Sequence, residues 1–168
     1  MHKLANGYYA VIPAASRGTR WAPSIEAAAY GIGASDYGPT AVVLMGLSAA
    51  RLHGAIPRAL AVAVAAVPKQ RPDLELAGSA GHVIFVRRET DRLDAERAQT
   101  DLGTALITGV EQTVLDLAHR PDLGNVRDEA IEATISLLPR CDERTLQQLA
   151  VAQRKRAALA RAREWADA

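Results

Sequence analysis

Residues 37–71, which read YGPTAVVLMGLSAARLHGAIPRALAVAVAAVPKQR, constrain the fold more than any other part of the chain. Ser48 is expected to cap a short helix that Gly54 ends, because serine favours the N-cap and glycine the position after the last turn. A proline turn then leads into residues 60–67, whose Ala/Val-rich run is typical of a buried strand. Polar residues end this strand abruptly. A short helix followed by such a strand predicts an α+β core.

The composition indicates a globular chain with a core of small side chains. Hydrophobic residues make up 49% of the chain and charged residues 23%, which excludes an intrinsically disordered protein. Aromatic residues contribute only 4%, so Ala, Leu and Val must fill the core. A length of 168 residues is enough for one ordinary domain that needs no disulfides to stabilise it.

Charge and cysteine content indicate the compartment. The net charge of +1 gives no global argument for a nucleic acid or an anionic membrane as partner. Cys141 is the only cysteine, so no internal disulfide and no cysteine-based metal site can form. The first residues lack the order of a signal peptide, and the longest apolar runs are too short to span a bilayer. We therefore expect a cytoplasmic protein without a membrane partner.

Two regions of unequal size are expected. Residues 1–22 carry the turn signal Asn6-Gly7 before a β-favouring run, which predicts a small hairpin. Residues 23–168 are expected to form an α+β domain. This domain has a small mixed or antiparallel sheet with packed helices, and a helical tail that starts at about residue 108.

Glycines and capping residues give the expected boundaries of the elements before the tail. Ser24 opens a helix that Gly31 and Gly33 are expected to end. The apolar strand described above is expected to pair with residues 82–87. Residues 96–107 are expected to form a further short hairpin.

Three helical segments are expected in the tail. Thr108 and Glu111 fit a capping box at the start of a helix that runs to His119. Asn125 is expected to cap the next helix. Asp142 begins a final helical region that runs to about Trp165.

Four segments together resemble the AbiEi-type antitoxins of bacterial type IV toxin–antitoxin systems. They are YYAVIP, SAARLHG, AVPKQR and EQTVLDLAHRP, and the resemblance extends from residue 4 to roughly residue 160. In that family a short winged-helix domain precedes an α+β domain with a helical tail. LANGYYAVIP resembles the wing hairpin, and the resemblance makes it a remnant of the wing. No helix-turn-helix precedes it in this sequence, so base reading by this chain alone is not expected.

The resemblance implies an antitoxin that neutralises a neighbouring nucleotidyltransferase toxin. It also implies autoregulation through operator DNA where a complete winged helix is present. A function as a DNA-binding transcriptional regulator only is a further alternative, and its binding would weaken with salt. No cofactor is expected for these functions.

Basic side chains at strand ends and in the tail are candidates for contact with a partner protein or nucleic acid. They are Lys69, Arg71, Arg87, Arg88, Arg154, Lys155, Arg156, Arg161 and Arg163. The alternative for each is a solvated strand end or a solvated terminal helix, since basic residues near a helix C-terminus suit the macrodipole.

One pattern points to an enzyme. HRPDLGN superficially resembles the H-R-D-L-x-x-x-N loop of protein kinases, in which the Asp accepts the hydroxyl proton and the Asn holds a metal ion. On this alternative the chain is an atypical serine/threonine kinase that phosphorylates the toxin with ATP and Mg²⁺. Its candidate residues are Lys69, Asp101, Asp122 and Asn125. An intervening proline and the lack of a G-x-G-x-x-G loop count against this alternative.

The histidines give no further chemistry. His2, His53, His82 and His119 lack the spacing of metal ligands, and no metal site is expected. His53 is expected to interact with the last carbonyls of a helix. Ser48 and His53 have no accompanying third group or oxyanion motif, so they predict no nucleophilic site.

Overall fold

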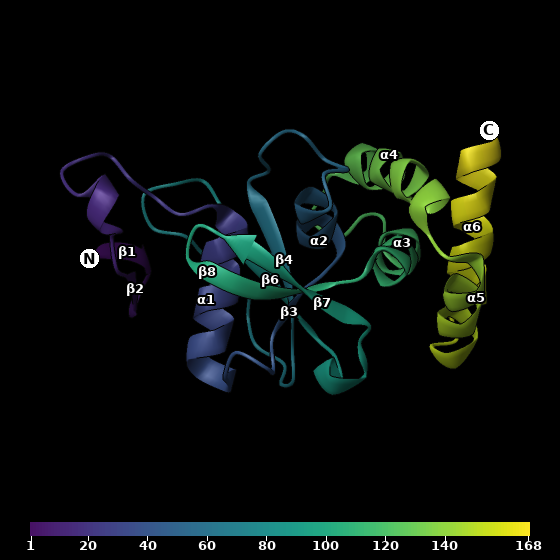
Figure 1. Cartoon of the computed structure of the whole chain (residues 1–168), viewed down its shortest axis with the longest axis horizontal. Helices are drawn as coiled ribbons and strands as arrows, with labels where there is room; N and C mark the ends of the chain where they lie inside the picture. Colours follow the sequence, from purple (N-terminus) through teal and green to yellow (C-terminus); the bar gives the residue numbers. More distant parts are fainter.

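The computed structural model describes residues 1–168, and a six-stranded sheet lies at its centre (Figure 1). The strands are β3 (Val43–Leu44), β4 (Val62–Val67), β5 (Leu74–Glu75), β6 (His82–Arg87), β7 (Ala95–Thr100) and β8 (Gly103–Thr108). Their order is β5-β6-β4-β3-β8-β7. β4 pairs parallel with β6 and antiparallel with β3, whereas β3 pairs parallel with β8. Both edge strands, β5 and β7, pair antiparallel with their neighbours.

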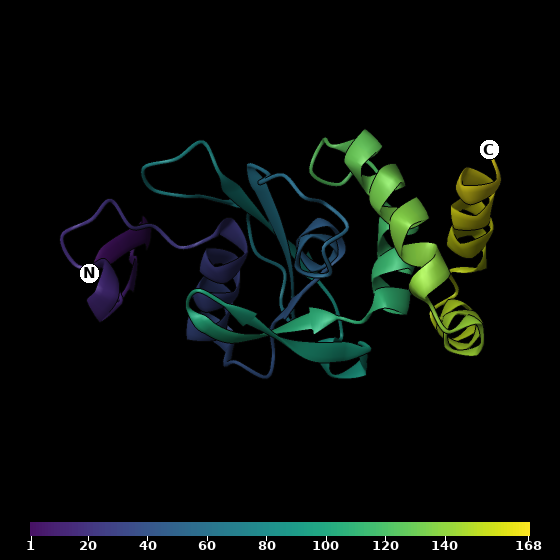
Figure 2. The same ribbon diagram turned by 45° about the horizontal axis from the view of Figure 1, so that its top comes forward.

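Helices cover both faces of this sheet. One face carries α1 (Ile25–Tyr37). The other carries α2 (Gly46–Leu52), α3 (Val110–His119), α4 (Arg127–Leu137), α5 (Glu143–Ala152) and α6 (Arg156–Asp167). Short 3-10 helices lie at η1 (Ala14–Ser16), η2 (Thr90–Arg92) and η3 (Leu138–Arg140). Figure 2 shows α3 to α6 grouped at the end of the molecule opposite α1 and the N-terminus. No helix combines the length and apolar character needed to cross a bilayer.

This arrangement confirms the expected fold class. The chain is α+β, with a small mixed sheet, packed helices and a helical C-terminal tail. The expected strand pairs are present, because β4 lies beside β6 and β7 forms a hairpin with β8. The description of the first residues as a wing remnant stays a prediction.

The N-terminal hairpin packs on the rest of the chain. It consists of β1 (His2–Ala5) and β2 (Tyr8–Ala10), joined through Gly7 at a φ of +86°. Leu4 is buried with α1 in one apolar cluster. The Tyr8 hydroxyl donates a hydrogen bond of 2.6 Å to Asp36 near the end of α1.

Strand β4 lies in the core between the two layers of helices. All six of its side chains are buried, and they alternate between the two faces of the sheet. Val62, Val64 and Ala66 pack with α2 to α6, whereas the residues between them pack with α1. Because β4 is covered on both faces, its sequence is continuously apolar.

Helix α1 is longer than expected. It continues through Gly31 and Gly33 and ends at Gly38, where φ is +89°. A Cβ at position 33 would lie 2.9 Å from a methyl carbon of Val42, so glycine is needed there for close packing. Ser24 caps the helix as expected, since its hydroxyl accepts a hydrogen bond from the amide of Ala27.

Two expected helix caps are wrong because their hydroxyl groups make other hydrogen bonds. Ser48 lies inside α2, and its hydroxyl accepts a 2.8 Å hydrogen bond from the buried amide of Val64. Thr108 ends β8, and its hydroxyl contacts that of Thr113 at 2.8 Å. Gly109 is the residue that precedes α3, and no side chain caps this helix. Gly54 follows α2 at a φ of +80°, as expected.

The tail has one wrong cap, one correct cap and one unexpected break. Asn125 adopts a φ of +57° in the turn before α4, and its side chain caps nothing. Asp142 does cap α5, because its carboxylate accepts a 2.8 Å hydrogen bond from the amide of Thr145. The final helical region is broken between α5 and α6, where Arg154 has a φ of +56°.

Candidate functional site

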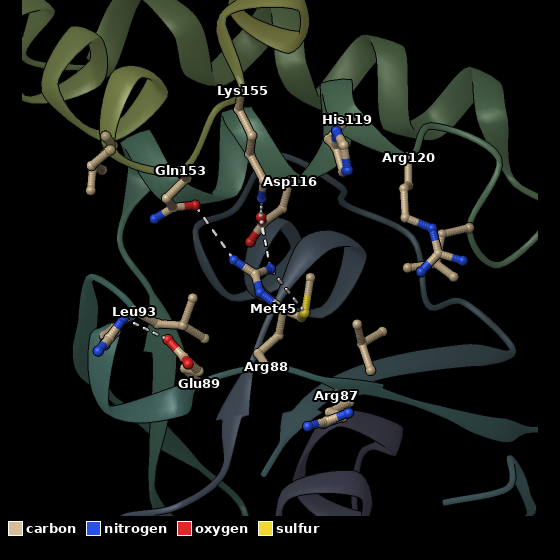
Figure 3. A pocket seen from close by; sticks show the side chains of 15 residues that line it. Met45, Arg87, Arg88, Glu89, Leu93, Asp116, His119, Arg120, Gln153 and Lys155 are labelled. Carbon is tan, nitrogen blue, oxygen red and sulfur yellow. Dashed lines mark hydrogen bonds and ion pairs between the residues drawn. The ribbon is translucent and has the colours of Figure 1, made fainter. Parts of the chain in front are cut away.

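A cleft of about 730 Å³ lies between the end of β6, the last turns of α3 and the turn that joins α5 to α6. Figure 3 shows its lining, with Arg88 near the centre and Lys155 and Asp116 meeting above it. The lining residues are Met45, Val86, Arg87, Arg88, Glu89, Arg92, Leu93, Asp116, His119, Arg120, Leu123, Leu149, Ala152, Gln153 and Lys155. Three distant parts of the sequence therefore build one site.

Asp116 organises the wall of this cleft. Its Oδ1 atom accepts from the Arg88 guanidinium at 3.1 Å and from the Lys155 ammonium at 2.5 Å. The same oxygen also accepts from the Gln112 amide at 3.0 Å. The Asp116 side chain is 0% exposed, so this carboxylate is buried between two cations. Its Oδ2 atom has no hydrogen-bond partner.

A pair of glutamines closes the side of this cluster. Gln112 donates to Gln153 Oε1 at 2.9 Å, and Gln153 donates back to Gln112 Oε1 at 2.5 Å. Arg88 also reaches Gln153 Oε1, at 3.4 Å. The reciprocal amide contact ties α3 to the turn after α5, and this turn carries Lys155.

The local sequence explains how each member reaches the cluster. Asp116 is the one carboxylate in the buried run of α3, among Val114, Leu115 and Leu117. An amphipathic helix turns its apolar side toward the core. Asp116 lies on that side of α3, so its buried carboxylate needs partners there. The break at Arg154 turns the chain so that Lys155 points inward, as Figure 3 shows.

Two basic groups in the cleft have lowered pKa values, mainly because they are removed from water. Partial removal from water, followed by repulsion from Lys155, lowers the pKa of the largely exposed His119, and the attraction of Asp116 opposes this effect only in part. Burial also lowers the pKa of Lys155, and the nearby Arg88 adds to that effect while Asp116 opposes it. Both directions mean that an additional positive charge is disfavoured in the cleft.

The lining carries more cations than anions. Its cationic side chains are Arg87, Arg88, Arg92, Arg120 and Lys155. Its anions are Glu89 and Asp116, and Glu89 pairs with Arg92 at 2.9 Å. Arg87 and Arg120 form no ion pair and no side-chain hydrogen bond. Their guanidinium groups are available to an anion.

The basic surface continues on both sides of the cleft. A neighbouring hollow shares Arg87 and Arg88 and reaches Thr40 and Pro68. A second hollow shares His119 and Arg120 and reaches Arg161.

The structure brings together three of the basic residues expected to contact a partner, Arg87, Arg88 and Lys155. Arg161 lies at the edge of this surface and donates to the carbonyl of Ala118 at 2.6 Å. Arg163 is paired with Glu143.

The remaining candidates lie outside the cleft. Arg71 turns to the opposite face of the sheet and pairs with Asp36 at 2.5 Å. Lys69, Arg154 and Arg156 are exposed.

The residues of the kinase alternative do not form one site. Asp101 accepts from the amide and the hydroxyl of Ser24, at 2.7 and 2.8 Å, on the α1 side of the sheet. Asp122 pairs with Arg127 at 3.0 Å in the connection between α3 and α4, on the other side. Lys69 is in contact with neither carboxylate, and Asn125 forms the turn before α4. No group of three His, Cys, Asp or Glu side chains is placed to hold a metal ion.

Reasoning from the sequence missed Asp116, His119 and Arg120 as members of the site. One signal was present for Asp116, because a single carboxylate within the apolar run VLDLA requires a buried partner. Nothing in the sequence indicates that this partner comes from residues 88 and 155.

No protein-family model matches this chain, and no curated protein has significant sequence similarity to it.

Proposed function

We propose that this chain is an AbiEi-type antitoxin that neutralises a nucleotidyltransferase toxin by binding an acidic surface of that toxin. The observation that carries the proposal is the gathering of Arg87, Arg88 and Lys155 in one cleft, beside the unpaired Arg120. Cations from separate elements that face one concave surface favour an acidic partner.

The contacts of the acidic residues favour binding over catalysis. Asp101 and Asp122 are engaged with Ser24 and Arg127 on different sides of the sheet. A phosphotransferase needs such groups around one nucleotide. The antitoxin proposal requires only the basic surface. The proposal also includes autoregulation of the operon by a chain that carries a complete winged helix.

Growth of cells that express the toxin tests the proposal. The nucleotidyltransferase encoded beside this chain is expressed with the wild-type chain, with R87E/R120E, or with R17E/R20E. Arg17 and Arg20 are exposed and lie near the N-terminus, and R17E/R20E changes the net charge by the same amount as R87E/R120E. We expect the wild type and R17E/R20E to restore growth and R87E/R120E to restore it poorly. Absence of rescue by soluble wild-type chain would reject the proposal.

The intact mass of the toxin separates binding from modification. The toxin is incubated with this chain, ATP and Mg²⁺, and its intact mass is then measured by mass spectrometry. We expect its mass to stay unchanged and the two proteins to co-elute on size exclusion. A mass increase of one phosphoryl group would support the kinase instead.

A further inference from the structure

We propose that the cleft is a binding site for a phosphoanhydride group, carried by a nucleotide or by inorganic pyrophosphate. Arg87, Arg120 and His119 are the groups that face this ligand, and Arg88 completes the site. The inference goes beyond the proposed function, because a small anion can bind here whether or not a toxin is the partner.

The first argument is the charge of the cluster. A single carboxylate, Asp116, stands between two cations, Arg88 and Lys155. One negative charge cannot neutralise both, and the Lys155 side chain is only 9% exposed. An uncompensated charge in so poorly solvated a place is costly. An anion in the cleft would compensate it.

The second argument is that the cationic wall is held in place before any ligand binds. Asp116, Gln153 and the Met45 sulfur hold the Arg88 guanidinium, at 3.1, 3.4 and 4.0 Å. A side chain that is already ordered loses little rotamer entropy when it binds. The Arg88 side chain is 20% exposed, so it is also reachable from the cleft.

The third argument concerns the type of anion. Arg87 ends β6, whereas Arg120 follows α3, so the two unpaired guanidiniums come from different elements. Figure 3 shows Arg87 below the cluster and Arg120 to its side, next to His119. One carboxylate occupies one guanidinium, but a chain of phosphates offers oxygens to several.

The shape of the cleft favours a nucleotide over bare pyrophosphate. Its volume of about 730 Å³ lies in the usual range for small-ligand sites. Val86, Leu93, Leu123 and Leu149 supply apolar lining beside the arginines. Such a wall accepts the flat face of a base. We therefore expect ATP to bind more tightly than pyrophosphate.

Calorimetric titration of the full chain at constant ionic strength tests the inference. The probes are ATP, pyrophosphate and adenosine, and the variants are R87Q/R120Q, R87E/R120E and R17Q/R20Q. We expect ATP and pyrophosphate to bind, adenosine not to bind, and R87Q/R120Q to weaken ATP binding at least about tenfold. R17Q/R20Q should bind like the wild type. Circular dichroism shows whether R87E/R120E is folded. If it is not, the uncharged variant R87Q/R120Q still provides the test.

His119 gives an independent readout by NMR. An anion in the cleft stabilises the imidazolium, so saturating pyrophosphate should raise the pKa of His119. Absence of heat and of a His119 shift with both phosphate probes would overturn the inference. So would equal losses in R87Q/R120Q and R17Q/R20Q.

The outcomes also separate this inference from the proposed function. Anion binding without rescue from the toxin supports the site and rejects the antitoxin. Rescue that depends on Arg87 and Arg120, without anion binding, supports a protein-binding surface and rejects the phosphoanhydride site.

Discussion

Two arginines that follow neighbouring parallel strands form clusters of different character. Arg71 comes after β4 and lies on the α1 side, where it meets Asp36 at 2.5 Å and the Tyr8 hydroxyl at 3.4 Å. Its guanidinium stands 4.2 Å from the centre of the Phe85 ring. Arg88 comes after β6 and lies on the opposite side, where it shares Asp116 with a lysine.

The difference lies in the ratio of charges. At Arg71 one cation meets one anion, and an aromatic ring and a hydroxyl complete its surroundings. This cluster ties the N-terminal hairpin to α1 and the sheet. At Arg88 two cations meet one anion, and the excess charge borders a cleft with further unpaired arginines. The first cluster needs no ligand, whereas the second has a charge that a ligand can balance.

The largest expected effect separates the two carboxylates. D116A leaves Arg88 and Lys155 facing each other with no anion, and breaking a buried ion pair in this way costs about 3–5 kcal/mol. D36A removes a partner at a more exposed site and should cost about 1 kcal/mol. Urea unfolding of both variants measures the difference. Equal losses would mean that the two clusters do the same structural work.

A smaller effect is expected at the glutamine pair. Q112A leaves the half-buried amide of Gln153 without its reciprocal partner, and the loss of a hydrogen bond of this kind costs about 0.5–1.5 kcal/mol. Q112A/Q153A removes both amides, so the double variant should be more stable than the sum of the single losses predicts. A double-mutant cycle by thermal unfolding measures this coupling. Strictly additive losses would argue against the contact between α3 and the turn after α5.

The ring beneath Arg71 should contribute less. In a cycle of F85L, R71M and the double variant, we expect a coupling of about 0.5–1 kcal/mol, which is typical of a cation–π contact. The same cycle with R88M in place of R71M is the control, since Arg88 lies on the other face. A coupling of zero in the R71M cycle would mean that the Phe85 ring does not stabilise the Arg71 cluster, which would then depend on the ion pair with Asp36.

The smallest effect concerns the pKa of His119, which K155M should change in addition to breaking the Lys155–Asp116 ion pair. K155M removes a cation that disfavours the imidazolium of His119, so the pKa of His119 should rise toward 6.5, its ordinary value. Because that pKa is lowered in the folded chain, stability is lost as pH falls from 6.5 through the folded pKa. K155M should therefore narrow the pH range over which His119 reduces the stability of the fold. NMR titration checks the shift, with D36A as a control in which it should not occur.

Much of the fold could be predicted because local signals carried it. Asp142 caps α5 and Gly54 ends the turn after α2, since these residue types suit those positions in any context. The continuous apolar residues of β4 predicted a buried strand. The errors arose where a tertiary contact overrode a local preference. Ser48 binds the amide of Val64 in the sheet, and Gly33 stays in a helix to make room for Val42.

The site was less predictable for the same reason. Arg87, Arg88 and Lys155 were candidates because they are basic, but so were Lys69, Arg154 and Arg156, which lie outside the cleft. Selecting among them requires knowing that α3 places Asp116 opposite the end of β6. That knowledge depends on pairing across the sheet, and no local pattern encodes it.

The shortness of β3 has a mechanical consequence. This two-residue strand joins the half-sheet β5-β6-β4 to the half-sheet β8-β7, with only Leu44 and Ile107 in register on the β8 side. Arg88 extends from the first half, and Asp116 lies on α3, which follows β8 of the second. The ion pair therefore crosses a narrow joint, and twisting of one half against the other would change the width of the cleft. A ligand that bridges Arg87 and Arg120 would stiffen this joint, and slower amide exchange at Val43 and Leu44 would reveal it.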